Sequence, residues 1–151
     1  MRVVIDYPKK EDEKKVLQMN KTETPQKKNT LDITAKDIEE IREYIESTIL
    51  VDEKIYDYVC TILNRLRELA KKTPEGQVLD YGPSTRAGLA LIRAGKTYAL
   101  LMGRDFVLPE DIKSLAYNIL EHRIGLSYTS LVEKKTSCQI VESVLNTILI
   151  P

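Results

Sequence analysis

Residues 82–103 read Gly-Pro-Ser-Thr-Arg-Ala-Gly-Leu-Ala-Leu-Ile-Arg-Ala-Gly-Lys-Thr-Tyr-Ala-Leu-Leu-Met-Gly. After the first turn, alanine, leucine and isoleucine leave this stretch apolar on nearly every face. Ser84 is a residue type that starts helices as the N-cap, and Gly103 is one that ends them. A helix that is apolar almost all round belongs in the centre of a larger fold. We therefore predict a buried central helix over about residues 84–102, with other helices packed around it.

Amphipathic helices are predicted on both sides of the central one. Upstream, Thr34 and Asp52 can cap two helices. Downstream, Pro109 suits the first position of a helix, and Thr136 can cap a last one. The fold class is therefore all-α, a helical bundle. The apolar stripes of these four helices are Ile38, Ile41, Ile45 and Ile49; Ile55, Val59, Ile62, Leu66 and Leu69; Ile112, Leu115, Ala116, Ile119 and Leu120; and Ile140, Val141, Val144, Leu145 and Ile148. The predicted connections include residues 73–82 and 127–135.

The N-terminal part has a different character. Val3-Val4-Ile5 is a short β-branched run stopped by Pro8, which predicts a strand, and a charged amphipathic helix is predicted over Lys9–Met19. One strand and one helix cannot close a core, so this part is interpreted as the end of something larger. The polar segment that follows holds one proline and shows no hydrophobic periodicity, which is typical of a linker. The predicted division is residues 1–20, the end of something larger; residues 21–32, a linker; and residues 33–151, the helical domain.

The composition excludes several classes of protein. The 151 residues hold 23 Lys and Arg against 23 Asp and Glu, so the formal net charge is zero. Nucleic acids and anionic membranes both require basic surfaces, so neither partner is indicated. No apolar run approaches the ~20 residues of a membrane-spanning helix. Cys60 and Cys138 form no CxxC pair, which argues against zinc and favours two reduced thiols in the core of a cytoplasmic protein.

Two short stretches imitate nucleotide-binding motifs. Gly95-Lys96-Thr97 matches the end of a P-loop, but Ala90 stands where that motif requires glycine, inside a predicted helix. Val3-Val4-Ile5-Asp6 resembles a strand ending in a Mg²⁺-binding carboxylate, yet Tyr7-Pro8 follows it and no catalytic Glu. Without a phosphate cradle or a metal site, phosphoryl transfer lacks its positioning groups. We therefore expect no catalytic residue and no metal ligand here, and no nucleotide hydrolysis by this chain alone.

Two further residues receive structural interpretations. His122 ends the fourth predicted helix beside Arg123, where cations suit the helix dipole, and it has no Ser, Cys or carboxylate at a telling spacing. Arg67 lies beside the buried stripe of the second helix. It is either a snorkelling residue or an interdomain contact.

Arg86 stands in an unusual place. If Ser84 is the N-cap, Thr85 is the first helical residue and Arg86 the second, where a cation opposes the helix dipole. One interpretation is an arginine that turns away to a carboxylate. The other is an anion site, where first-turn N–H groups and the guanidinium converge on a phosphate. The spacing alone leaves both open.

Three stretches occur in a fixed order: Gly82-Pro83-Ser84-Thr85-Arg86-Ala87, Gly103-Arg104-Asp105-Phe106-Val107-Leu108-Pro109-Glu110-Asp111, and His122-Arg123. In this order and spacing they resemble the C-terminal part of MoxR-type AAA+ ATPases. That family combines a Gly-x-Ser-Pro-Arg-Ala turn, an Ala/Leu-rich helix, a Gly-Arg-Asp-(Tyr/Phe)-Val-x-Pro-Glu-Asp segment and a His-Arg pair. The likeness covers essentially the whole chain and is strongest over Val51–Leu126.

The resemblance implies a helical lid that follows an α/β core carrying the P-loop, the Mg²⁺ motif and the arginine finger. Residues 1–20 would then be a remnant of that AAA+ core, namely its last strand and helix. In such lids the arginine of the turn is the sensor 2 residue, which reaches the γ-phosphate of ATP. Arg86 occupies this position, and Gly82, Ser84 and Thr85 form its supporting turn. The lid of such a bacterial ATPase would close over ATP and couple hydrolysis to chaperone-like remodelling of protein partners.

The resemblance also implies cofactors and partners. ATP and Mg²⁺ belong to the full-length protein, and none is expected to be bound to this chain alone. The implied partners are its own AAA+ core, further copies in a homo-hexamer, protein substrates, and a von Willebrand A domain protein.

Two residues depart from the family pattern. Thr85 stands where the family usually has proline, which makes the turn less rigid, although Pro83 can partly compensate. Leu108 stands where threonine is frequent, and it lacks an N-cap oxygen typically worth ~1 kcal/mol. A second function stays open, namely a stand-alone helical protein-interaction module without nucleotide chemistry. A long helix followed by a short link and Pro109-Glu110-Asp111-Ile112 also suits histone-like folds.

Overall fold

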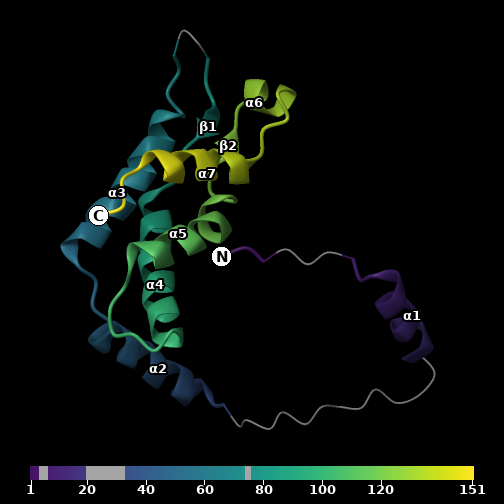
Figure 1. Cartoon of the computed structure of the whole chain (residues 1–151), viewed down its shortest axis with the longest axis vertical. Coiled ribbons are helices and arrows are strands. Elements are labelled where there is room, and N and C mark those ends of the chain that lie inside the picture. Colours follow the sequence, from purple (N-terminus) through teal and green to yellow (C-terminus); the bar gives the residue numbers. More distant parts are fainter. Residues whose placement is uncertain (4–6, 20–32, 74–75) are drawn as a thin grey trace.

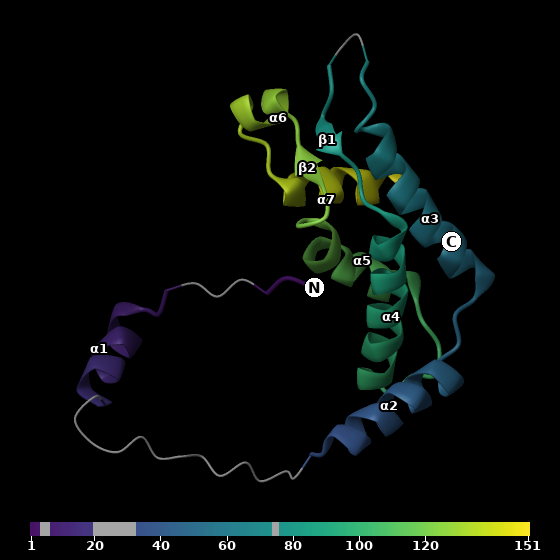
Figure 2. The ribbon, with the colours of Figure 1, turned by 180° about the vertical axis from the view of Figure 1, so that it is seen from behind.

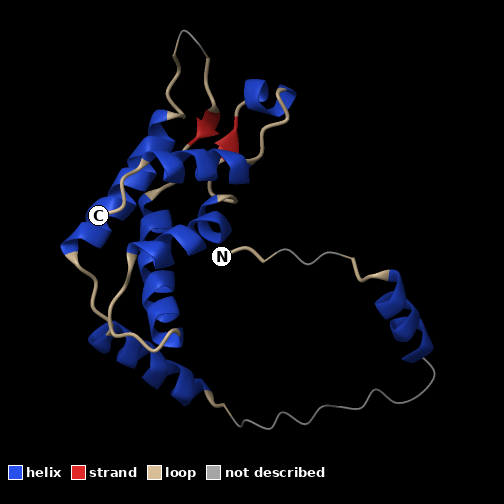
Figure 3. Cartoon of the chain, in the orientation of Figure 1, coloured by secondary structure: helices blue, strands red, loops and turns tan. Residues whose placement is uncertain are grey.

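The computed structural model describes residues 1–3, 7–19, 33–73 and 76–151. This described part is mostly helical (Figure 3), which confirms the all-α prediction. Its elements in chain order are α1 Lys10–Met19, α2 Ala35–Thr48, α3 Glu53–Glu68, β1 Leu79–Tyr81, α4 Thr85–Leu101, α5 Pro109–Leu120, β2 Gly125–Leu126, α6 Tyr128–Val132 and α7 Ser137–Thr147.

α4 lies in the middle of the bundle (Figure 1), where it packs against α2, α3 and α5. Two glycines let its neighbours come close. A Cβ on Gly88 would lie 2.9 Å from Cδ1 of Leu63 in α3, and a Cβ on Gly95 would lie 2.9 Å from Cδ1 of Ile112 in α5. The predicted central helix is therefore confirmed, but it is not buried on every face, since Leu89 and Leu101 are 55% and 76% exposed. Its side chains with no exposed surface are Ala87, Leu91 and Ala99.

α4 ends in a Schellman motif at Gly103. The φ angle of Gly103 is +71°, a left-handed value that glycine adopts at little cost. Its N–H donates to the carbonyl oxygen of Leu100 at 2.9 Å, and the N–H of Arg104 donates to that of Ala99 at 2.9 Å. The chain is thereby turned out of α4 with Arg104 aimed at the start of α5.

Arg104 and Asp111 lock the link between α4 and α5. The two Nη atoms of Arg104 donate to the two carboxylate oxygens of Asp111 at 2.9 and 2.7 Å, and Asp111 is only 3% exposed. The same carboxylate accepts the N–H of Leu108 at 2.9 Å. Asp111 therefore satisfies the N-cap backbone of α5, although Leu108 itself has no oxygen to offer.

The apolar stripe of α2 is buried only in its second half. Ile45 and Ile49 are buried, whereas Ile38 and Ile41 are 46% and 51% exposed. α2 crosses one end of α4 (Figure 1), so only its C-terminal half meets the bundle. The stripes predicted for α3, α5 and α7 are buried or half-buried throughout.

Two segments predicted as connections contain regular structure, which corrects the sequence analysis. Within residues 73–82, β1 pairs antiparallel with β2. Within residues 127–135, α6 begins after Ser127, whose hydroxyl accepts the N–H of Ser130 at 3.2 Å. Ser130 in turn donates its hydroxyl to the carbonyl oxygen of Val78 at 2.8 Å. Elements this short are held in place by long-range contacts and are too short to show a hydrophobic periodicity. The sequence pattern therefore could not reveal them.

The N-terminal predictions are tested only in part. The helix is confirmed as α1, whose described side chains are exposed and which stands apart from the bundle in both views (Figure 2). Val3 is not in a strand, and Val4-Ile5 lies outside the described residues, as does the predicted linker, residues 21–32. The N–H of Arg2 donates to the carbonyl oxygen of Asn118 in α5 at 2.8 Å. The division of the chain into three parts stays a prediction.

The prediction of two core cysteines is wrong, because Cys60 and Cys138 are both exposed. In α3, Val59 and Ile62 face the core, and Cys60 falls on the solvent side of the same turn. In α7, burial begins at Ile140, and Cys138 lies one half-turn earlier.

Candidate functional site

The turn before α4 is held against α3. A Cβ on Gly82 would lie 2.9 Å from Cα of Arg67, a distance at which only glycine fits against backbone. Nε of Arg67 donates to the carbonyl oxygen of Pro83 at 2.9 Å, and the Pro83 side chain is fully buried. Arg67 therefore helps to fix this turn within the bundle, and its role as an interdomain contact stays a prediction.

The first turn of α4 leaves two N–H groups unused. Ser84 is the N-cap as predicted, with φ −79° and ψ 169°, but its hydroxyl makes no capping hydrogen bond. The N–H of Ala87 donates to the carbonyl oxygen of Ser84 at 2.9 Å. Within the described residues, no acceptor takes the N–H of Thr85 or Arg86. These donors carry the partial positive charge of the helix start, so this end of α4 is open to an anion.

Arg86 is exposed at this helix start. Across the described ranges its side chain has no ion pair and no hydrogen bond, so the interpretation of an arginine turned to a carboxylate finds no partner. Arg86 lines a groove of about 610 Å³ on the surface of α4, together with Arg93, Thr97 and Arg123. The apolar part of the groove is Leu89, Ala90 and Ala94.

The convergence of these arginines was not predicted from the sequence. Arg123 was assigned only to the helix dipole, and Arg93 was assigned no role. Arg93 follows Arg86 by seven residues, which is two helical turns, so the spacing alone could have placed both on one face. Arg123 joins them only through the fold, because α5 packs along α4 and ends beside this face.

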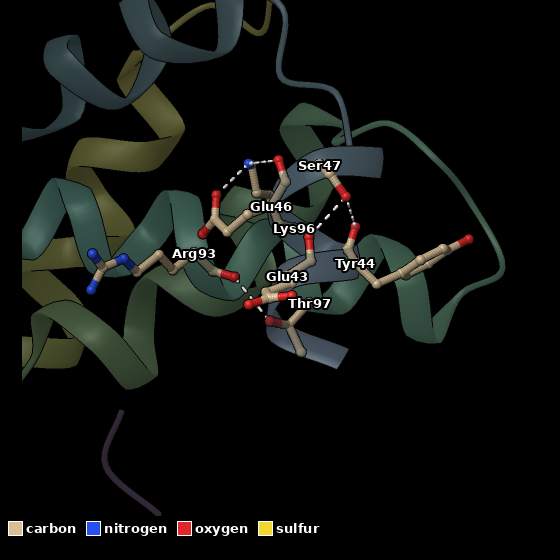
Figure 4. A network of polar contacts seen from close by, with 7 residues as sticks. All are labelled: Glu43, Tyr44, Glu46, Ser47, Arg93, Lys96 and Thr97. Carbon is tan, nitrogen blue, oxygen red and sulfur yellow. Dashed lines mark hydrogen bonds and ion pairs between the residues drawn. The ribbon is translucent and has the colours of Figure 1, made fainter. Parts of the chain in front are cut away.

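The false P-loop is an ordinary piece of helix, as predicted. Gly95-Lys96-Thr97 lies inside α4. Lys96 pairs with Glu46 of α2 at 2.7 Å, and the Thr97 hydroxyl donates to the carbonyl oxygen of Arg93 at 3.0 Å (Figure 4). The Arg93 guanidinium extends away from this network of α2 and α4 side chains. Lys96 therefore serves helix packing, and Arg93 stays available to the groove.

His122 follows α5 on the surface. Desolvation lowers the pKa of His122 below its usual 6.5, and the positive charge of Arg123 lowers it further. The imidazole is therefore neutral at neutral pH and adds no charge beside Arg123. In the part of the chain that the structure covers, no cluster of His, Cys, Asp or Glu could hold a metal ion. No helix in that part is both long and apolar enough for a membrane span.

Several known proteins resemble this chain in sequence or in fold. The AAA lid domain family matches residues 72–144. The chain is 28% identical to "Chaperone MoxR1" of Mycobacterium tuberculosis over 157 aligned residues, which cover 99% of this chain. A solved structure of a candidate ATPase from Cytophaga hutchinsonii superposes with a TM-score of 0.76 over 97% of this chain, at 32% identity. The chain carries the lid domain of a MoxR-type AAA+ ATPase.

This MoxR-type lid corresponds to only part of its relatives. The chain spans 40% of MoxR1 and 45% of the Cytophaga chain. It is also 31% identical, over 68% of its length, to the uncharacterized protein YeaC of Bacillus subtilis, of which it spans 30%. The family match includes the turn at Gly82, all of α4 and α5, and Arg123. The family match therefore covers the residues that position Arg86 and its groove.

Proposed function

We propose that this lid closes over an ATP molecule held by a AAA+ core, and that Arg86 contacts the γ-phosphate. The proposal is supported by the surroundings of Arg86. Its side chain is exposed, has no partner in the described part of the chain, and lies beside two unused backbone N–H groups. A guanidinium presents parallel N–H donors that match two phosphate oxygens at once. A helix start adds further donors and a favourable dipole.

The contact would make the position of the lid depend on the state of the nucleotide. Hydrolysis and release of phosphate remove the charge that Arg86 meets, so the closed lid loses an interaction that the open lid never had. A ligand shifts a conformational equilibrium only through such a difference. Mg²⁺ would be held by the core, because the described residues of the lid offer no cluster of ligands for it.

The partners follow from the same proposal. The lid would act with its own AAA+ core in a homo-hexamer, and its movement would drive chaperone-like remodelling of protein substrates. A von Willebrand A domain protein is a further expected partner. The relative MoxR1 is named a chaperone, which supports the proposed remodelling of protein substrates.

Replacement of Arg86 in the full-length ATPase tests the proposal. Arg86→Ala should lower kcat for ATP hydrolysis about 100-fold, the loss typical of removing one positioned donor to developing charge. Arg42→Ala is the matched control, since Arg42 is an exposed arginine of α2 that does not line the groove and has no ion pair with any described residue. Wild-type turnover by the Arg86→Ala protein would exclude this role.

A further inference from the structure

The arginines of the described residues fall into two groups. One group has ion-pair or hydrogen-bond partners: Arg2 with Glu121, Arg65 with Glu68, Arg67 with Pro83 and Asn64, and Arg104 with Asp111 and Phe106. The side chains of the other group, Arg42, Arg86, Arg93 and Arg123, have no such partner in the described ranges. Three of these four line one groove.

The groove contains no carboxylate. Its lining is three arginines, one threonine and three apolar residues, in a chain whose net charge is zero. The nearby acidic side chains are engaged elsewhere, since Glu121 pairs with Arg2 at 3.6 Å and Glu46 with Lys96 at 2.7 Å. The lining of this groove therefore carries three positive charges and no negative one, which favours an anion as its ligand.

Arg123 adds a second, independent observation. Its Nε atom is buried and has no hydrogen-bond partner in the described part of the chain. A buried donor of a charged group without an acceptor is costly, so such groups are normally satisfied by a partner or a ligand. The C-terminal end of α5 holds this guanidinium against α4, where it faces the same groove as Arg86 and Arg93.

The spacing of the groove suits an extended anion. Arg86 and Arg93 are seven residues apart in α4, which corresponds to about 10 Å along the helix axis. A single carboxylate can meet only one guanidinium at that separation. A chain of linked phosphates carries several charges over a comparable length, and guanidinium groups pair with phosphate oxygens through two donors.

We infer that Arg93 and Arg123 continue the Arg86 site as a groove for linked phosphates, as found in a nucleoside triphosphate. This inference rests on the proposed function for its ligand, but it adds two phosphate contacts that the lid itself supplies. Arg86 binds at the helix start, Arg123 faces it from the end of α5, and Arg93 extends the site along α4. The affinity of the lid alone is about millimolar, because the core contributes nothing and exposed ion pairs are weak.

An NMR titration of the 151-residue chain with tripolyphosphate tests the groove. At an ionic strength of about 10 mM the Debye length is about 30 Å, so weak charge pairing is visible. The Nε–Hε signals of Arg86, Arg93 and Arg123 should shift in a saturable way, while that of Arg42 stays in place. Arg123→Gln and Arg93→Gln should each weaken binding about fivefold. Arg42→Gln removes the same charge from another face and should change it less than about twofold.

The outcomes separate this inference from the proposed function. If only the Arg86 signal shifts, the groove is overturned and the Arg86 proposal stands. If the Arg93 and Arg123 signals shift and that of Arg86 does not, these two arginines do not continue the Arg86 site and the inference is overturned. The Arg86 proposal itself stands or falls with the turnover of the full-length Arg86→Ala protein. Equal losses in Arg42→Gln and Arg123→Gln would mean non-specific attraction, and no saturable shift would mean no site, so either result overturns the inference. Arg93 is exposed, so its variant gives a result even if Arg123→Gln fails to fold.

Discussion

The substitution Gly82→Ala tests how the turn before α4 is built. The new Cβ would lie 2.9 Å from Cα and 3.3 Å from N of Arg67, which are backbone atoms of α3 and cannot rotate away. Overpacking of this kind costs about 2 kcal/mol. Separation of the turn from α3 also breaks the 2.9 Å bond between Arg67 and Pro83, worth about 1 kcal/mol. Gly82 is outside the helices, so alanine gains no helix propensity to offset this cost.

The total, about 3 kcal/mol, should lower the Tm of the chain by about 10 °C, measured by circular dichroism. Arg67→Gln is the control that removes the hydrogen bond without a clash, and it should lower Tm by about 3 °C. A Gly82→Ala protein that melts at the wild-type temperature, or no lower than Arg67→Gln, would refute the close approach of the turn to α3.

Three further predictions concern individual polar contacts. Asp111→Ala should lower the free energy of unfolding by about 3 kcal/mol in chemical denaturation. It leaves the half-buried guanidinium of Arg104 without its ion-pair partner and the N–H of Leu108 at the cap of α5 without an acceptor. Ser84→Ala should change it by less than about 0.5 kcal/mol, since its hydroxyl makes no capping bond, whereas Thr136→Ala breaks a capping box and should cost about 1 kcal/mol. Hydrogen bonds from the backbone and hydroxyl of Thr34 hold the pKa of Asp37 below 3.8. Its contribution to stability is therefore full above the unfolded pKa of about 3.9 and is lost as the pH falls through the folded value. A carboxyl carbon titration by NMR with a midpoint at or above 3.8 would contradict this.

Much of the fold could be predicted from local patterns. The apolar residues of α4 indicated a central helix, and the caps and stripes of α3, α5 and α7 gave their places and inward faces. The exposed half of α2 could not be foreseen, because periodicity shows which face is apolar but not how far the neighbouring helix extends. Ile38 and Ile41 continue the stripe of Ile45 beyond the point where α4 supports it.

The site was predicted through one residue only. Arg86 emerged from its position in the helix and from the family resemblance, and the structure places it at the helix start with its N–H donors unused. The sequence did not show that Ser84 leaves those donors open, because that depends on the rotation of one hydroxyl. It also did not show that Arg123 joins the groove, because that contact depends on how α5 packs on α4.

The most direct measurement of the central claim compares ATP with ADP. A contact between Arg86 and the γ-phosphate acts on ATP and has nothing to act on in ADP. In the full-length ATPase, Arg86→Gln should raise the Kd of ATP about tenfold, as for a lost charge-assisted hydrogen bond, and leave the Kd of ADP within about twofold of wild type. Equal weakening of both nucleotides, or no weakening of ATP, would contradict the assignment of Arg86 to the γ-phosphate.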